Sequence, residues 1–314
     1  MRIAAAQLRP VWLDPGATTE KVIAAIAEAS AQGVELLAFP EAFLSGYPFW
    51  ISRTDGAKFD DPRQKAAYAA YLAAAVELGG PELTRIAEAV REHGVFTYLG
   101  ITERGRTAGR GTVYCTLVAI DPAAGVVSAH RKLVPTYDER MVWGRGDGNG
   151  LRVHRVGDLR AGGLNCWENW MPAARLALYA GGEDVHVGVW PGSCALTADI
   201  TRFIALEGRV WSLAASGLLS PADVPAGFPL RDELAALTDP LPFNGGSGVV
   251  SPSGEWLIGP IEGEERLVIA DVTRQAVGAE RLNSDPTGHY SRPDVLALTV
   301  DRRRHEPVAF VDAP

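Results

Sequence analysis

The chain has 314 residues, of which 47% are apolar, so it is long enough and apolar enough to bury a large core. Its formal net charge is −8, and a negative surface repels a phosphate backbone, which argues against nucleic-acid binding. No apolar run reaches the roughly 18 residues of a membrane span, and the apolar run at the N-terminus is too short for a signal peptide. We therefore expect a cytoplasmic protein.

Hydrophobic periodicity predicts alternating strands and helices in the first half of the chain. Residues 1–7 are apolar and predict a strand, and Thr18 or Thr19 is suited to cap a helix that reaches about Gln32. The following predicted elements are a strand over 34–39, helices over 64–78 and 81–93, a strand over 95–101, and a hairpin of strands over 112–120 and 126–131.

The second half continues with short strands and two further helices. These elements are a strand over 160–165, a helix over 171–180, a strand over 185–189, a helix over 198–209, and strands over 210–216, 248–251, 255–258 and 266–271. A mixture of hairpins and helices favours an α/β or α+β sandwich over a strictly alternating parallel sheet. No polar linker divides the chain, so we expect a single domain over residues 1–314, with roughly 285–314 as a C-terminal tail.

Three short patches, far apart in the chain, each present one reactive side chain at the end of a predicted strand. Glu41 follows LLAFP, Lys132 follows SAHR, and Cys166 follows GGLN. A carboxylate that moves protons, a cation that stabilises negative charge and a thiol that forms a bond are the groups needed for covalent attack at a carbon–nitrogen bond. Considered alone, each residue also has a non-catalytic interpretation: Cys166 as a small buried side chain, Glu41 as a surface carboxylate and Lys132 as a solvated lysine.

The three cysteines are few and odd in number, and none forms a Cys-x-x-Cys pair, so we expect free thiols and no zinc site. Cys166 follows a strand that contains Gly162-Gly163 and precedes a predicted helix, whose N-terminus is expected to lower the pKa of the thiol. Cys115 lies in an alternating apolar run and is expected in the core. Cys194 is expected in a loop.

A buried Glu41 would have a raised pKa and would need a cationic partner, for which Lys132 is the natural candidate. His130, His186 and His289 are alternative bases. None of the three has a neighbouring acid or asparagine that would complete a Cys–His arrangement, so that alternative is the weaker one.

Other residues around the patches are candidates for binding or support. Glu139 lies seven residues after Lys132, and alone it would be read as a surface charge. Glu168 fits either an acid in the first turn of a helix or a pocket residue. Aromatic residues in the Gly- and Pro-rich loops near the patches predict a pocket for an apolar substrate. The residues expected to contact substrate are Tyr47, Trp167, Glu168 and Trp190.

Taken together and in this order, the patches resemble the motifs of the nitrilase, or carbon–nitrogen hydrolase, superfamily, and the resemblance extends from AAAQLRP to SDPTGHYSRPDV. It implies that Glu41 is the general base, Lys132 the charge stabiliser and Cys166 the nucleophile. It also implies that Glu139 is a second glutamate beside the lysine. The sequence CWE at the nucleophile is similar to the nitrilase branch of the superfamily.

The resemblance further implies an α-β-β-α sandwich of two mixed sheets flanked by helices, whose protomers pair across a helix surface. It implies hydrolysis of an organic nitrile to a carboxylic acid and ammonia through a cysteine thioimidate and thioester, with water and without a metal or organic cofactor. Leu44-Ser45 departs from the usual pattern and could alter the pocket floor. Because the chain ends soon after GHYSRPDV, we expect a homodimer or larger homo-oligomer and leave filament formation open.

Two alternatives to a nitrilase stay open at this point. An amidase of the same fold would hydrolyse a carboxamide by the same covalent route. A non-catalytic binding protein on this scaffold would be expected to lack the nucleophile or the acid, and both are present. The aromatic loops favour an aryl or arylaliphatic nitrile, but a short aliphatic nitrile is also compatible with the sequence.

Overall fold

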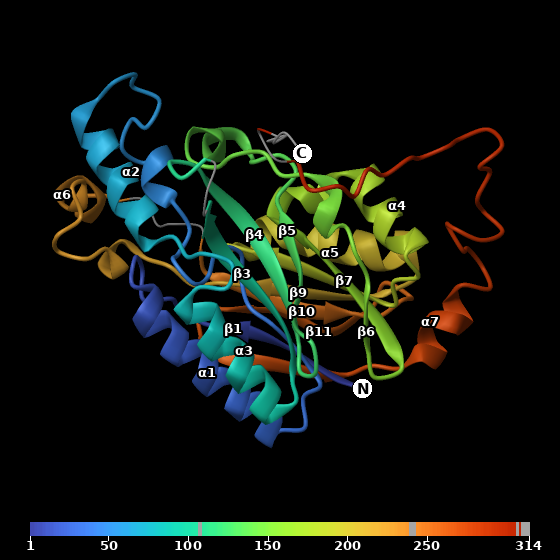
Figure 1. Cartoon of the computed structure of the whole chain (residues 1–314). Coiled ribbons are helices and arrows are strands. Elements are labelled where there is room, and N and C mark those ends of the chain that lie inside the picture. Colours follow the sequence, from blue (N-terminus) through green and yellow to red (C-terminus); the bar gives the residue numbers. More distant parts are fainter. Residues whose placement is uncertain (106–108, 239–242, 306–307, 309–314) are drawn as a thin grey trace, which may run out of the picture.

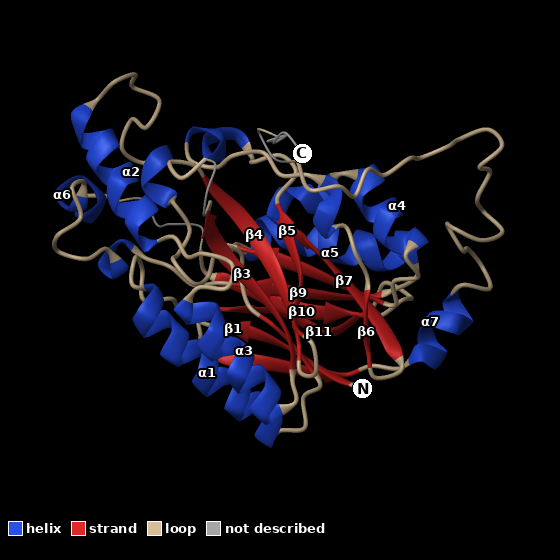
Figure 2. Cartoon of the chain, in the orientation of Figure 1, coloured by secondary structure: helices blue, strands red, loops and turns tan. Residues whose placement is uncertain are grey.

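Two six-stranded mixed sheets pack face to face, and helices cover the outer face of each sheet (Figures 1 and 2). This computed structural model describes residues 1–105, 109–238, 243–305 and 308. The layers confirm the α-β-β-α sandwich that the sequence predicts.

The strands of the first sheet lie in the order β12-β1-β2-β3-β4-β5, with parallel pairing only on the two sides of β2. They are β1 (Arg2–Gln7), β2 (Leu36–Ala38), β3 (Phe96–Arg104), β4 (Val113–Asp121), β5 (Gly125–Arg131) and β12 (Arg266–Asp271). The second sheet has the order β11-β10-β9-β8-β7-β6, with β7, β8 and β9 parallel. Its strands are β6 (His154–Val156), β7 (Leu159–Asn165), β8 (Val185–Trp190), β9 (Trp211–Ser216), β10 (Gly245–Val250) and β11 (Trp256–Glu262).

Four helices form the outer layers. Helices α1 (Pro15–Ala31) and α3 (Pro81–His93) cover the first sheet, whereas α4 (Pro172–Ala180) and α5 (Cys194–Gly208) cover the second. The remaining helices are α2 (Pro62–Ala74), α6 (Arg231–Ala235) and α7 (Arg274–Glu280). Figure 1 shows α2 and α6 at one end of the sandwich and α7 at the other. Within the described ranges, no helix is both long and apolar enough to span a bilayer.

Strand β1 illustrates how local sequence builds the layers. Successive side chains of a strand point to opposite faces, so an uninterrupted apolar strand can contribute to two cores. Ile3 and Ala5 pack between the sheets, and Ala4 and Ala6 pack beneath α1 and α3. The continuous apolar run at the start of the chain therefore belongs to a strand that is covered on both faces.

Helix α1 begins earlier than the sequence analysis predicts. Asp14, and neither Thr18 nor Thr19, caps the helix, because its carboxylate accepts a hydrogen bond from the N–H of Ala17 at 2.9 Å. Pro15 suits the first helical position, since its missing N–H would have no partner there. The two threonines are buried within the first turns, and each hydroxyl donates to a carbonyl four residues before it.

Other predicted boundaries also change, among them those of two helices. Helix α2 is capped by Asp61 and ends at Ala74, four residues before the predicted end. Helix α5 begins at Cys194, which makes this cysteine helical, in contrast to the loop position expected from the sequence. The preceding Ser193 has a φ of 97°, so the turn into α5 is made by an unusual backbone conformation.

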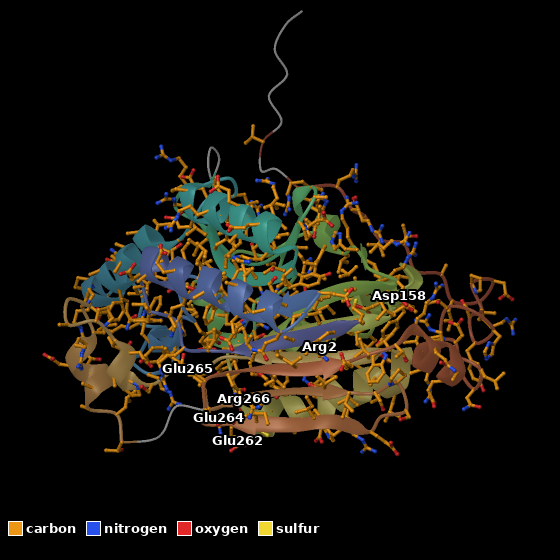
Figure 3. All side chains as sticks on the ribbon, turned by 90° about the horizontal axis from the view of Figure 1, so that it is seen from below. Arg2, Asp158, Glu262, Glu264, Glu265 and Arg266 are labelled. Atoms are coloured by element: carbon orange, nitrogen blue, oxygen red, sulfur yellow. The ribbon has the colours of Figure 1, made fainter. Side chains whose placement is uncertain are left out.

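The chain passes from the second sheet back to the first at the turn between β11 and β12, because β11 belongs to the second sheet and β12 to the first. Charged side chains gather around this turn (Figure 3). Arg266 pairs with Glu264 at 2.9 Å, and Glu265 pairs with Lys21 of α1 at 3.0 Å. The crossing therefore lies on a solvated, charged edge of the sandwich.

The described part of the chain after α7 contains neither helix nor strand and crosses the surface back toward β5 (Figure 1). Arg304 donates to the carbonyl of Ala129 at 2.7 Å and pairs with Asp147 at 3.2 Å. The side chain of Asn149 donates to the carbonyl of Arg302 at 3.1 Å. Polar contacts thus attach the end of this segment to the body of the protein.

Candidate active site

The three reactive side chains from distant parts of the sequence lie together at the ends of β2, β5 and β7. The ammonium of Lys132 donates to Glu41 Oε1 at 2.9 Å and to Glu139 Oε2 at 2.7 Å. A carboxylate oxygen of Glu41, a carboxylate oxygen of Glu139 and the sulfur of Cys166 lie within 4.8 Å of one another. All four side chains are buried, so their charges interact strongly.

Glu41 is held at the end of the run that begins in β2. Its backbone N–H donates to the carbonyl of Trp190 at 3.3 Å, and its Oε1 accepts from Lys132 and from the thiol of Cys115 at 3.4 Å. Its Oε2 has no hydrogen-bond partner among the described residues. Burial raises the pKa of Glu41 to about 7, against the opposing effect of Lys132. This carboxylate can therefore gain and lose a proton near neutral pH, and one of its oxygens is unengaged.

Lys132 follows β5, and its N–H continues the strand pairing by donating to the carbonyl of Cys115 at 2.8 Å. Burial opposes a positive charge at this position, but Glu41 and Glu139 outweigh it and raise the pKa of Lys132 well above its usual range. The side chain is therefore a permanent ammonium between two carboxylates.

Glu139 lies in a short 3-10 helix, η2 (Tyr137–Met141), with its side chain directed inward. Its Oε2 accepts from Lys132 and from the backbone N–H of Thr136 at 2.6 Å, and its Oε1 accepts from the hydroxyl of Tyr47 at 2.9 Å. Glu139 is thus suited to orient the ammonium of Lys132.

Cys166 is the first residue of another short 3-10 helix, η4 (Cys166–Trp170), and has a φ of 46°. Non-glycine residues rarely adopt this conformation, which is typical of sharply turned functional residues. Burial and, next, the charge of Glu41 raise the pKa of the thiol well above its usual range. The lowered pKa expected from a helix N-terminus is therefore wrong, because burial and a nearby carboxylate outweigh any effect of a single short turn.

Glu168 does not line the cavity next to Cys166, in contrast to its expected contact with substrate. It is buried, and its Oε1 accepts from the N–H of Leu133 at 2.8 Å. Its Oε2 accepts from the N–H of Asn165 at 3.1 Å and lies 2.9 Å from Nε2 of His130. Glu168 therefore links the residue before the cysteine to the residue after Lys132.

A second buried network supports the turn at Cys166, and the sequence analysis did not identify it. Asn169 donates from Nδ2 to the carbonyl of Cys166 at 2.8 Å. Its Oδ1 lies 2.7 Å from Nε2 of His186, whose Nδ1 lies 3.1 Å from Glu183. His186 therefore has an acid beside it, Glu183. Through Asn169, this pair supports the backbone carbonyl of Cys166 and not its sulfur. Only the position of Asn169, three residues after Cys166, could have suggested its role.

A cavity of about 220 Å³ opens beside the sulfur. Tyr47, Trp167 and Trp190, which the sequence predicts as substrate contacts, line this cavity, and Trp167 is 46% exposed. Phe243 and Leu196 add apolar walls that were not predicted from the sequence. Phe243 lies in a loop and Leu196 in the first turn of α5, and no motif marks either residue. The polar lining residues are Ser52, Arg53, Thr136, Asp138, Glu139, Ser193 and Thr197.

The donors Glu41, Glu139 and Cys166 form a set that a metal ion could use. Lys132 already donates to both carboxylates, so it supplies the positive charge at this place, and a divalent ion would have to displace it. The residues present therefore fit a site whose cation is the lysine.

The chain is similar to known proteins along almost its whole length. The family model described as carbon–nitrogen hydrolase matches residues 2–281. A "Nitrilase 2" from an unknown prokaryotic organism is 36% identical, with 99% of this chain and 95% of the relative covered. An "Aliphatic nitrilase" of Rhodococcus rhodochrous is 34% identical, with 98% and 84% covered.

A solved structure of a similar fold is an E41Q mutant of the amidase from Nesterenkonia sp. AN1. It is 22% identical, with a TM-score of 0.64 and with 90% of this chain and 97% of the other covered. At this identity the likeness supports the fold. Together with the family match and the full-length relatives, it leads to one conclusion: the chain belongs to the carbon–nitrogen hydrolase family.

Proposed function

We propose that this enzyme is a nitrilase, which hydrolyses an organic nitrile to the carboxylic acid and ammonia. The observation that carries the proposal is the geometry of the site. Lys132 donates hydrogen bonds to the carboxylates of Glu41 and Glu139, and the sulfur of Cys166 lies beside both carboxylates. Full-length relatives named as nitrilases, at 34–37% identity, support this substrate class.

In the first half of the reaction, Glu41 accepts the proton of the Cys166 thiol as the sulfur bonds to the nitrile carbon. The proton then passes from Glu41 to the nitrile nitrogen, and the product is a neutral thioimidate. The raised pKa of the thiol means that it needs a base at the moment of attack, and burial raises the pKa of Glu41 to about 7, which suits that task.

In the second half, a water adds to the thioimidate carbon and gives its proton to Glu41. Negative charge on the tetrahedral intermediate is stabilised by Lys132 and by the backbone N–H of Trp167, which donates to the cysteine sulfur in the resting enzyme. The nitrogen takes up protons and leaves as ammonia, and a thioester remains. A second water hydrolyses the thioester, and Glu139 keeps Lys132 in position throughout.

The rate should depend on pH through Glu41. The carboxylate must be deprotonated to accept the thiol proton, and burial raises its pKa to about 7. We therefore expect kcat/KM to increase as pH rises through about 7 and to be lost below it. Initial rates of ammonia release from about pH 5.5 to about pH 8.5 check this expectation. A profile that is flat across this range would contradict the assignment of Glu41 as the base.

The choice between nitrilase and amidase is tested with matched substrates. Ammonia release is measured for aliphatic, arylacetic and aromatic nitriles, each beside its own carboxamide, with the Cys166→Ala variant as the blank. We expect turnover of at least one nitrile to the acid, and slower turnover of the matching amide. Turnover of amides without any turnover of nitriles would replace the proposed function by an amidase.

We also propose a homodimer or larger homo-oligomer in the cytoplasm. Leu176 of α4 and Phe203 of α5 are large apolar side chains exposed on the outer helix layer, which supports pairing across that surface. The three cysteines are free, which is consistent with a reducing compartment. Analytical ultracentrifugation that detects only monomer over a wide range of concentrations would contradict the oligomer.

A further inference from the structure

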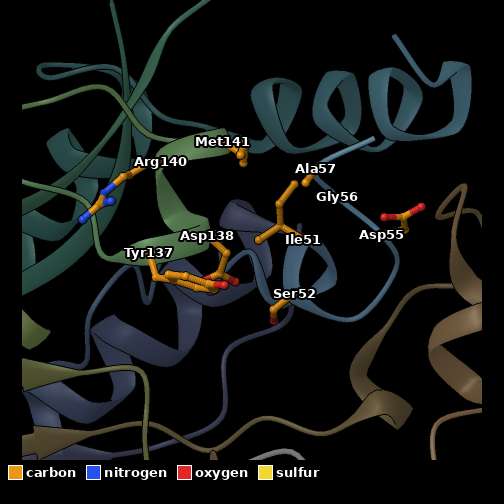
Figure 4. A pocket seen from close by; sticks show the side chains of 9 residues that line it. All are labelled: Ile51, Ser52, Asp55, Gly56, Ala57, Tyr137, Asp138, Arg140 and Met141. Atoms are coloured by element: carbon orange, nitrogen blue, oxygen red, sulfur yellow. The ribbon is translucent and has the colours of Figure 1, made fainter. Parts of the chain in front are cut away.

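A second pocket, of about 480 Å³, lies next to the cavity at Cys166. Figure 4 shows the side chains that line this second pocket. Ser52 and Asp138 line both spaces, so the two are neighbours at these residues. We call the cavity beside the sulfur the inner cavity and this second space the outer pocket. The outer pocket is lined by Ile51, Ser52, Asp55, Gly56, Ala57, Tyr137, Asp138, Arg140 and Met141.

The helix η2 lies between the two spaces and contributes to each of them. Glu139, at its centre, is 1% exposed and accepts a hydrogen bond from Lys132 beside the inner cavity. Tyr137 and Met141, at its two ends, are 82% and 58% exposed and line the outer pocket. Large apolar side chains at such exposure contribute little to the core of the protein, and a cluster of them at a concave surface is typical of a binding site.

The opposite wall comes from the 3-10 helix η1 (Phe49–Ser52) and the loop after it. Phe49 and Trp50 are buried in the core, which fixes the position of this short helix. Ile51 lies at the centre of the lining side chains in Figure 4, and Ala57 lies beside it. Two short helices with buried side chains, η1 through Phe49 and Trp50 and η2 through Glu139, therefore frame the pocket.

We propose that the outer pocket binds the distal aromatic or apolar end of an extended nitrile while its nitrile carbon lies at Cys166. This inference rests on the proposed nitrilase function and specifies its substrate class. The inner cavity is smaller than the roughly 300–1,000 Å³ of a site for a drug-sized ligand, so a longer substrate has to extend beyond it. The outer pocket is the space next to the inner cavity at Ser52 and Asp138, and the proposed path of the substrate passes between these two residues.

The charges around the outer pocket favour a neutral distal group. Asp55 and Asp138 bring negative charge to its lining, and Arg140 brings positive charge. The guanidinium of Arg140 donates from Nε to the carbonyl of Pro135 at 3.1 Å and points away from the other lining side chains in Figure 4. Two carboxylates against this one guanidinium disfavour a carboxylate at the distal end, whereas an aromatic ring would bury apolar surface.

The test uses a series of ω-phenylalkyl nitriles, from phenylacetonitrile upward in chain length, with kcat/KM measured from ammonia release. Two variants change the outer pocket in opposite ways. Ala57→Trp fills it from an exposed loop position, and Met141→Ala removes part of a wall. Leu257→Ala is the matched control, because Leu257 is a comparably exposed apolar side chain on β11.

For each protein, the result is the ratio of kcat/KM for the longer nitriles to that for phenylacetonitrile. We expect this ratio to fall about tenfold or more in Ala57→Trp and several-fold in Met141→Ala, because a change of apolar contacts in a pocket alters the preference between substrates by such factors. The change should appear mainly in KM. The Leu257→Ala control should keep the wild-type ratio.

The outcomes separate this inference from the proposed function. If the wild-type enzyme hydrolyses phenylacetonitrile and both variants keep the wild-type ratio, the outer pocket is not a substrate site, although the nitrilase function stands. If the wild-type enzyme hydrolyses no nitrile of the series or of the earlier panel, both proposals fail. If light scattering detects a changed oligomer mass in Ala57→Trp while the ratio is unaltered, the pocket is a contact between copies and the inference is overturned.

Discussion

Replacement of Cys166 by alanine is expected to reduce nitrile hydrolysis by at least about 10⁴-fold, because no other group in the site can form the covalent intermediate. Glu41 and Lys132 are hydrogen-bonded to each other, and the neighbouring thiol of Cys115 is buried and does not line the inner cavity. Steady-state ammonia release measures the loss. Intact-mass spectra during turnover should detect an acyl adduct on the wild-type enzyme that is absent from the variant.

The matched control for this prediction is Cys194→Ala. Cys194 is a free, half-buried thiol at the start of α5 and does not line the inner cavity. It should retain activity and still form the adduct. Ammonia release that survives in Cys166→Ala, or an adduct located on another cysteine, would remove Cys166 from its proposed role.

The second large effect is expected from Lys132→Met, which replaces the ammonium by an apolar group of similar length. Loss of a donor that stabilises a developing charge typically lowers the rate about 10²–10³-fold. The variant should also unfold more easily, by about 3–5 kcal/mol, because removal of one partner leaves a buried charge without compensation. In this case two carboxylates, Glu41 and Glu139, lose their shared cation.

The stability deficit of Lys132→Met should depend on pH. Burial and the charge of Glu139 raise the pKa of Glu41 in the folded protein above its value in the unfolded chain, and loss of the ammonium removes the largest opposing effect. The folded state then binds protons more tightly than the unfolded state, so its stability falls as pH rises and recovers as pH falls. Urea unfolding at about pH 8 and about pH 5 should therefore give a larger deficit at the higher pH.

An exposed lysine provides the comparison for these measurements. Lys65 of α2 pairs with Asp60 at the surface, and Lys65→Met should change the unfolding free energy by less than about 1 kcal/mol at either pH. Equal deficits of Lys132→Met at both values of pH would show that lost packing, and not uncompensated charge, causes the destabilisation.

Much of the fold was predictable because strands and helices follow from neighbours along the chain. The apolar run of β1, the glycine that closes α3 and the turn between β4 and β5 all lie where the local sequence indicates. The cap of α1 was missed because Asp14, Thr18 and Thr19 are all competent capping residues, and the choice depends on where the chain enters the helix layer.

The sequence by itself determined the residue types of the site and their attachment to strand ends, since side-chain chemistry and strand endings are local properties. Only the tertiary structure decided the contacts of Glu168 and the direction of the pKa shift of Cys166. Glu168 meets His130 across 38 residues of chain, and Lys132 meets Glu41 across 91. Burial and charge at a point in space depend on every segment that reaches it, so these properties appear only when the two sheets have come together.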